Sequence, residues 1–279
     1  MISGSLIHHA HQRRASNLTT PLFVKTAGEG ESQILFIHGL MASHRYWENQ
    51  ISEFSKNHFI VAPDLLGFGN SPWPKSGYTF ESHLNSLEHT LKIVGIPEKP
   101  FVIVGHSLGA ILALRYAATH PDRVSKVLIL AIPLFRTKED AQKSMKKSST
   151  MESMMGLNSV IAPLLCFFHE ALGPGAVPLF RPFMKGFPDS VIEDATKHTW
   201  ASFHETVENV IIGADITGDL KKIGAGKITL VIGDSDHDQP AAELEKIKAL
   251  GVEIITVRGD HNFPLQSPVQ INDLIHKMF

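Results

Sequence analysis

The stretch Phe101–Ala118, FVIVGHSLGAILALRYAA, decides how this chain folds. It is nearly long enough to cross a bilayer as one apolar helix. The run Gly105–Gly109 interrupts it, however, and divides it into a β-branched part and an alanine- and leucine-rich part. A short apolar run of β-branched residues is typical of a buried strand, and the second part is typical of a helix. The sequence therefore predicts a strand, a tight turn and a helix here, and no membrane span.

Similar apolar runs lie on both sides of this unit. They are continuous rather than alternating, which indicates strands covered on both faces, as in a parallel sheet. Helical stretches such as Ser82–Val94, with apolar residues three and four apart, separate most of them. Alternating strands and helices predict an α/β fold with a mostly parallel, doubly wound sheet. The predicted strands are Ile34–His38, Phe59–Ala62, Phe101–Gly105, Val127–Ala131, Ile228–Ile232 and Val252–Val257.

The alternation stops between Pro133 and about Val207. This stretch contains six prolines and no good strand run, and a charged segment at its start gives way to residues rich in Met, Leu and Phe. Predicted sheet strands lie on either side of it, so we interpret it as a mainly helical insertion rather than a linker. The predicted division is a core formed by residues 1–132 and 208–279, and an insertion at residues 133–207.

The composition is that of an ordinary globular protein. The 26 basic and 28 acidic residues give a net charge of −2, so nucleic acid is a poor default partner. The single cysteine, Cys166, cannot form an internal disulfide, and the N-terminal segment has no apolar run typical of a secretory signal. These features predict a cytoplasmic protein, and they leave its oligomeric state open.

The turn Gly105–Gly109, GHSLG, places a serine between the predicted strand and the predicted helix. A serine at such a turn has a strained backbone, and its hydroxyl projects above the sheet. The crowding there admits only small residues two positions before and two positions after the serine, and Gly105 and Gly109 meet that requirement. Ser107 is therefore the predicted nucleophile.

A serine hydroxyl needs a base to take its proton, and the base needs a group that orients it. Two loops at the carboxyl ends of later strands offer both, at the same edge of the sheet as Ser107. His261 follows the last predicted strand and is the expected base, and His237 is its competitor. The carboxylates that compete for the role of the acid are Asp234, Asp236 and Asp238.

These motifs resemble those of the α/β-hydrolase family over nearly the whole predicted core. His38–Leu40 looks like the family's HG oxyanion loop, and Asp64–Ser71 resembles the D-x-x-G-x-G-x-S turn that follows it. Ser107 matches the nucleophile, and Gly259–His261 resembles the histidine loop. The resemblance implies a serine hydrolase of the α/β-hydrolase fold whose insertion is the family's helical cap.

The resemblance also assigns the remaining roles. The family's acid motif is a glycine three residues before the aspartate and a proline four residues after it, which Gly233, Asp236 and Pro240 match. Asp236 is thereby favoured as the acid. The backbone N–H groups of Leu40 and Leu108 are implied to form the oxyanion hole. We expect neither a metal nor a cofactor.

The substrate pocket is expected to be apolar. The insertion falls where the family carries its cap, so some of its apolar residues are expected to line an acyl pocket. His38 and Gly39 are further candidates from the oxyanion loop. Arg45, just beyond that loop, is expected to be a solvated surface arginine rather than a contact for an anionic substrate. The candidates from the insertion are Met154, Met155, Phe167 and Phe168.

Together these features predict a carboxylesterase-like serine hydrolase that cleaves an ester of a small to medium hydrophobic substrate through an acyl-enzyme intermediate. A C–C bond hydrolase or a lactonase of the same fold is an alternative. Ala110 after Gly109 departs from the Ser-x-Gly-Gly sequence that such C–C hydrolases usually show. A receptor of this fold that binds a ligand with slow or no turnover is the alternative from another class.

Overall fold

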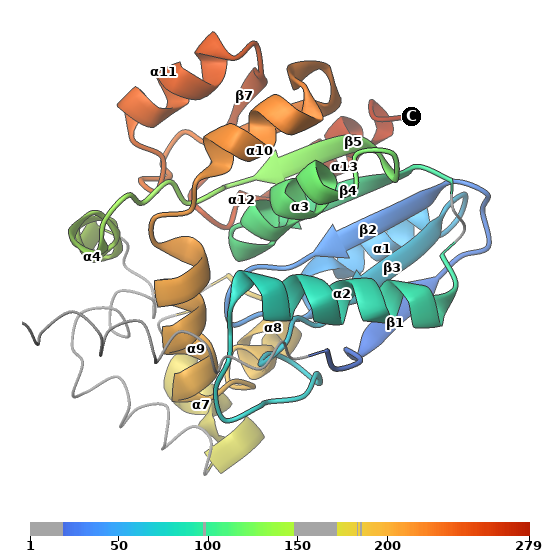
Figure 1. Ribbon diagram of the computed structural model, residues 1–279. Helices are drawn as coiled ribbons and strands as arrows, with labels where there is room; N and C mark the ends of the chain where they lie inside the picture. Colours follow the sequence, from blue (N-terminus) through green and yellow to red (C-terminus); the bar gives the residue numbers. More distant parts are fainter. Residues whose placement is uncertain (1–18, 97–98, 148–171, 183, 185) are drawn as a thin grey trace, which may run out of the picture.

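The computed structural model describes residues 19–96, 99–147, 172–182, 184 and 186–279. Within these residues a seven-stranded sheet forms the centre of the molecule (Figure 1). Its strands are β1 (Val24–Ala27), β2 (Gln33–Ile37), β3 (Phe59–Pro63), β4 (Phe101–His106), β5 (Val124–Leu130), β6 (Ile228–Gly233) and β7 (Glu253–Val257). Their spatial order is β1-β3-β2-β4-β5-β6-β7, in which β1 is antiparallel to β3 and the other neighbours are parallel.

All six predicted strands are present, and the mostly parallel sheet confirms the predicted fold class. The prediction missed β1, because its sequence VKTA contains no apolar run and its two central residues are exposed. It was also wrong about β7, which was expected to be covered on both faces. β7 forms the last edge of the sheet, so four of its five residues are partly or fully exposed.

Helices cover both faces of the sheet (Figure 1). The helices that pack on it are α1 (Glu48–Phe54), α2 (Phe80–Val94), α3 (Leu108–Thr119), α10 (Ile216–Ile223), α11 (Ala241–Ala249) and α13 (Pro268–His276). In β2, Leu35 and Ile37 pack with residues of α2, α3 and α10, whereas Ile34 and Phe36 pack with residues of α1 and α13. Successive side chains of a strand point to opposite faces, so two covered faces require a continuous apolar sequence.

The ends of α2 follow from its flanking residues. Thr79 caps the helix, because its side chain accepts the backbone N–H of Ser82 at 3.2 Å. The helix ends at Gly95, whose φ of 72° is left-handed and easily adopted only by glycine. The predicted start at Ser82 was therefore two residues late, since apolar spacing alone does not mark a cap.

The chain between β5 and β6 is mainly helical where the structure describes it. Its elements are α4 (Lys138–Lys147), η3 (Gly173–Ala176), α7 (Val177–Phe180), α8 (Asp189–Asp194), α9 (Trp200–Thr206), the π-helix η4 (Val207–Ile211) and η5 (Ala225–Lys227), besides α10. The helices α7, α8 and α9 lie beyond the carboxyl ends of the strands (Figure 1). In the described part of the chain, no helix has both the length and the apolar character needed to cross a membrane.

Candidate functional site

Ser107 lies at the sharp turn between β4 and α3. Its φ of 53° and ψ of −117° are strained for a residue with a side chain. A Cβ added to Gly105 would lie 2.4 Å from the carbonyl oxygen of Gly109, and one added to Gly109 would lie 2.1 Å from that of Ile37. No side chain fits at such distances. The prediction that crowding admits only small residues two positions before and after Ser107 is therefore confirmed.

Ser107, His261 and Asp236 form a continuous chain of hydrogen bonds. Ser107 Oγ lies 3.0 Å from His261 Nε2, and His261 Nδ1 lies 3.1 Å from Asp236 Oδ2. His261 follows β7. Asp236 follows β6, so three loops at one edge of the parallel sheet bring these side chains together. In this geometry the Ser107 hydroxyl donates to Nε2, and Nδ1–H donates to the carboxylate.

The Asp236 side chain is almost completely buried, yet it remains ionised at neutral pH. Burial by itself raises the pKa of Asp236, but the hydrogen bond and charge of His261 outweigh it, and the pKa falls to about 2. Gln239 Nε2 also donates to Oδ2 at 2.9 Å, and the backbone N–H of Asp238 donates to Oδ1 at 3.1 Å. An ionised carboxylate in this position can hold the imidazole ring and stabilise its positive charge.

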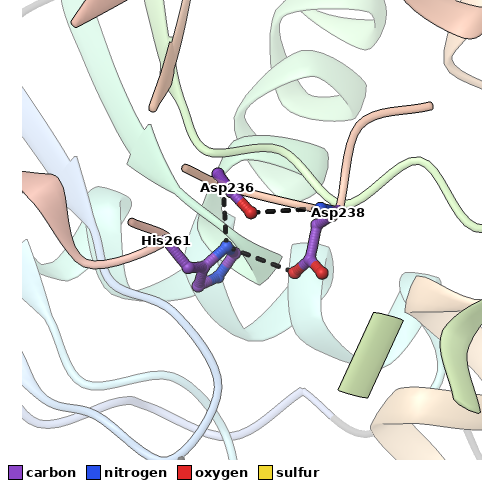
Figure 2. A group of neighbouring side chains, drawn as sticks. All are labelled: Asp236, Asp238 and His261. Carbon is purple, nitrogen blue, oxygen red and sulfur yellow. Dashed lines mark hydrogen bonds and ion pairs between the residues drawn. The ribbon is translucent and has the colours of Figure 1, made fainter. Parts of the chain in front are cut away.

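The other predicted acids and the competing base occupy different positions. Asp234 Oδ1 accepts hydrogen bonds from the backbone N–H of Gly259 and from Ser235 Oγ, both at 3.0 Å, so its carboxylate is used within the loop. Asp238 Oδ2 lies 3.2 Å from His261 Nδ1, and both Asp236 and Asp238 point toward this ring (Figure 2). The side chain of His237 is exposed. The structure thus places His261, and not His237, beside Ser107.

The loop after β2 packs directly against the serine turn. A Cβ added to Gly39 would lie 3.2 Å from Ser107 Cβ and 2.9 Å from His106 Nδ1. Leu40, the next residue, lines the same cavity as Ser107. Leu108 is the first residue of α3, so its backbone N–H has no partner within the helix. Leu40 and Leu108 therefore flank Ser107, one in the facing loop and one next in the chain.

His38 does not line this cavity, contrary to the expectation that it contacts substrate. It is fully buried, its Nδ1–H donates to the carbonyl oxygen of Gly39 at 2.7 Å, and its Nε2 accepts the N–H of Leu65 at 2.8 Å. Burial lowers the pKa of His38, which favours the neutral ring that this pair of bonds requires. His38 ties the loop after β2 to the chain after β3, and so holds Gly39 in place.

A cavity opens in front of Ser107. Its polar residues include His106, Ser107, His261 and Asn262. Its apolar wall includes Leu40, Met41, Met184, Phe187, Val191 and Ala195. Of these six residues only Leu40 was predicted, since nothing in the sequence distinguishes an apolar residue that lines a cavity from one that packs inside the protein. The predicted pocket residues Met154, Met155, Phe167 and Phe168 lie outside the described residues.

A cluster of ion pairs holds α8 against the loop after β2. Arg45 donates to both oxygens of Asp194, and its Nε lies 2.6 Å from Oδ2. Ser43 Oγ donates to the same carboxylate, and Lys197 Nζ lies 3.0 Å from its Oδ1. Asp194 is buried. Arg45 is therefore not the solvated surface arginine that was expected: it holds the helix whose Val191 lines the cavity.

Asp236, Asp238 and His261 are also the one group in the described part of the chain whose donor atoms are close enough to hold a metal ion. Their atoms converge on His261 Nδ1. When His261 Nε2 accepts a hydrogen bond from the Ser107 hydroxyl, the neutral ring carries its proton on Nδ1. Nδ1 then has no lone pair to offer a metal ion. The contact between Ser107 and His261 therefore favours hydrogen bonding over metal binding here.

Several curated proteins have similar sequences. The probable lysophospholipase BODYGUARD 4 of Arabidopsis thaliana is 30% identical over 257 residues, which cover 84% of this chain and 60% of that protein. Lipase LipV of Mycobacterium tuberculosis is 36% identical over 101 residues, which cover 36% of this chain and 37% of that protein. The chain spans about half the length of the first BODYGUARD relatives, between 44% and 60%.

Solved structures resemble the chain over most of its length. A marine microorganism esterase superposes with a TM-score of 0.68 at 19% identity, covering 94% of this chain and all of that chain. The enol-lactonase from Burkholderia xenovorans LB400 gives a TM-score of 0.66 at 19% identity, covering 92% of this chain and 95% of that chain. At these identities the likeness shows the fold.

The family model described as alpha/beta hydrolase fold matches residues 33–268. The match runs from the start of β2 to the start of α13, and it includes Ser107, Asp236 and His261. The resemblance of the sequence motifs, the topology of the sheet and this match agree. The chain belongs to the α/β-hydrolase family.

Proposed function

We propose that this protein is a serine hydrolase that cleaves an ester bond of a small to medium hydrophobic substrate. The observation that carries the proposal is the chain of hydrogen bonds from Ser107 Oγ through His261 to Asp236, with distances of 3.0 and 3.1 Å, at an apolar cavity. The similarity to a lysophospholipase and a lipase supports an ester as the bond that is cleaved.

In the first half of the proposed reaction, Ser107 Oγ attacks the carbonyl carbon while His261 Nε2 takes the hydroxyl proton. The imidazolium that forms is stabilised by the ionised carboxylate of Asp236. Negative charge develops on the substrate oxygen, where the backbone N–H groups of Leu40 and Leu108 are the proposed donors. One such donor contributes about 2.7–4 kcal/mol to stabilising the transition state.

In the second half, the C–O bond to the leaving alcohol breaks, and His261 gives its proton to the alkoxide oxygen. The acyl group is then bound to Ser107. A water molecule that loses its proton to His261 attacks this acyl-enzyme, the acid leaves, and Ser107 Oγ regains the proton. An alkoxide is an easier leaving group than an amine, so this geometry suits an ester better than an amide.

Two expectations from the sequence extend this proposal. We propose that residues 133–207 form the cap over the reactive serine, because Met184, Phe187 and Val191 from this segment line the cavity that contains Ser107. We also propose a cytoplasmic location, which the single cysteine favours. Hydrogen exchange of the insertion and cell fractionation test these two proposals.

Hydrolysis of p-nitrophenyl esters from acetate to palmitate tests the proposed function. We expect turnover by the wild type, and a loss of at least 10³-fold in kcat for Ser107→Ala and for His261→Ala. Ser235→Ala is the matched control, since this serine lies in the same loop as Asp236 and its hydroxyl donates to Asp234 Oδ1 instead of contacting His261. Full activity of Ser107→Ala would refute the proposal. The preferred chain length measures the depth of the cavity.

A further inference from the structure

His261 Nδ1 faces two carboxylates. Asp236 Oδ2 lies 3.1 Å from this nitrogen and Asp238 Oδ2 lies 3.2 Å from it, on two sides of the ring edge (Figure 2). The backbone N–H of Asp238 donates to Asp236 Oδ1 at 3.1 Å, which fixes the two residues relative to each other. The proposed reaction needs one carboxylate at Nδ1, so the second one has no role in it.

Asp238 is held from the other side by the chain between β5 and β6. Ser144 of α4 donates its hydroxyl proton to Asp238 Oδ1, and Ser144 is itself buried. The backbone N–H of Leu134 donates to the carbonyl oxygen of Asp238 at 2.9 Å. One carboxylate oxygen of Asp238 thus contacts α4, and the other contacts the histidine.

The charges around Asp238 couple it to the histidine. Burial raises the pKa of Asp238 above its usual value, the neighbouring charge of Asp236 raises it further, and the positive charge of His261 opposes both. His237 is the other titratable group that acts on it, and α4 contributes the Ser144 hydroxyl. Asp238 is therefore ionised most readily when His261 is positively charged.

We propose that Asp238, held in place by Ser144 of α4, is a second carboxylate partner of His261 Nδ1 and a positioning residue of the active site. It orients the ring together with Asp236 and stabilises the imidazolium that forms when Ser107 attacks. Through Ser144, the position of α4 acts on the reactive histidine. The proposed effect of Asp238 on the reaction rate rests on the proposed function. Its proposed effect on the titration of His261 rests on the geometry alone.

Two measurements on the full chain test the inference. The first is the pH dependence of kcat/KM for a p-nitrophenyl ester, whose acidic limb reports His261 in the free enzyme. The second is the titration of the His261 ring by NMR, with His261→Ala to assign its signal, and it needs no substrate. The variants are Asp238→Asn, Ser144→Ala and Asp236→Asn. Asp234→Asn is the matched control, since it changes a carboxylate of the same loop that contacts Gly259 instead.

Removal of a negative charge beside Nδ1 destabilises the imidazolium, so His261 loses its proton at lower pH. We expect both midpoints to fall by about one pH unit in Asp238→Asn, because an opposite charge this close shifts a pKa by about 1–3 units and Asp236 remains. Ser144→Ala shifts them in the same direction by less, and Asp234→Asn leaves them unchanged. kcat on the alkaline plateau falls no more than about tenfold in Asp238→Asn, against about 10⁴-fold in Asp236→Asn.

Unchanged midpoints in a folded Asp238→Asn, checked by circular dichroism, would overturn the inference. A loss of kcat as large as that of Asp236→Asn would also overturn it, since Asp238 would then be the principal acid. If Asp238→Asn does not fold, Ser144→Ala decides, because this variant keeps both carboxylates. If the wild type hydrolyses no ester but the NMR midpoint shifts as expected, the proposed function fails and the contact between Asp238 and His261 stands.

Discussion

Asp194→Ala is expected to lower the free energy of unfolding by about 3 kcal/mol. The carboxylate of Asp194 is buried and accepts hydrogen bonds from Ser43 and from two nitrogens of Arg45, and it pairs with Lys197. Breaking a buried ion pair by removing one partner costs about 3–5 kcal/mol, because the other charge is left uncompensated. Arg45 and Lys197 are each 23% exposed, so water takes over part of their solvation, and we expect the low end of this range.

Urea unfolding at pH 7 measures this effect, and Glu193→Gln is its matched control. Glu193 contacts the same two cations, at 3.3 Å from Arg45 and 2.9 Å from Lys197, but its side chain is 34% exposed. An exposed ion pair contributes about 0–1 kcal/mol, so this variant is expected to lose less than 1 kcal/mol. Equal losses in Asp194→Ala and Glu193→Gln would refute the buried character of the cluster.

The same variant has a second expected effect, on catalysis. Asp194 ends α8, and Val191 of this helix lines the cavity beside Ser107. Loosening of α8 is expected to raise KM for long-chain esters more than it lowers kcat, since the hydrogen bonds of Ser107 and His261 do not involve this helix. Steady-state kinetics of Asp194→Ala and Glu193→Gln on short and long p-nitrophenyl esters separate the two parameters.

Three further predictions follow from the buried groups, the serine turn and the histidine. Burial lowers the pKa of His83 and of His106 to about 3, so between about pH 6.5 and pH 3 the unfolded chain binds protons that the folded chain excludes. The free energy of unfolding therefore decreases as the pH is lowered through this window, by up to about 1.4 kcal/mol per pH unit for each ring. Urea unfolding at pH 7, 6 and 5 should show a smaller decrease in His83→Gln than in the wild type. Gly109→Ala is expected to lower the unfolding temperature strongly or to prevent folding, whereas Gly226→Ala, where an added Cβ meets nothing within 4 Å, should have little effect; equal melting temperatures would contradict this. Ester turnover is expected to be unchanged by EDTA, since Nδ1 of His261 carries a proton, and a loss that zinc or manganese restores would contradict it.

Much of the fold was predictable because its signals are local. Continuous apolar runs gave the covered strands β2, β4 and β5, and the glycines around Ser107 marked the turn between strand and helix. Strand β1 carries no such run, since an edge strand exposed on both central residues needs no apolar sequence. At the far edge of the sheet the opposite happens. The apolar sequence of β7 predicted a strand covered on both faces, but an edge strand is not covered in that way.

The position of the hydrogen-bonded residues Ser107, His261 and Asp236 was easier to predict than that of their surroundings. Ser107, Asp236 and His261 each follow a strand, and the parallel sheet brings their loops to one edge. The contacts of Asp238 with Ser144, and of Arg45 with Asp194, join residues 94 and 149 positions apart. No local pattern in the sequence marks such pairs, because they depend on how the chain between β5 and β6 folds over the sheet.

Covalent labelling with a fluorophosphonate tests the nucleophilicity of Ser107 most directly, because the reagent requires an activated serine and no knowledge of the substrate. The predicted result is one label per chain, found by mass spectrometry on the peptide that contains Ser107. Labelling is expected to disappear in Ser107→Ala and to become much slower in His261→Ala, whose serine has lost its base. An unlabelled wild type, or equal labelling of the wild type and Ser107→Ala, would contradict a hydrolase that acts through this serine.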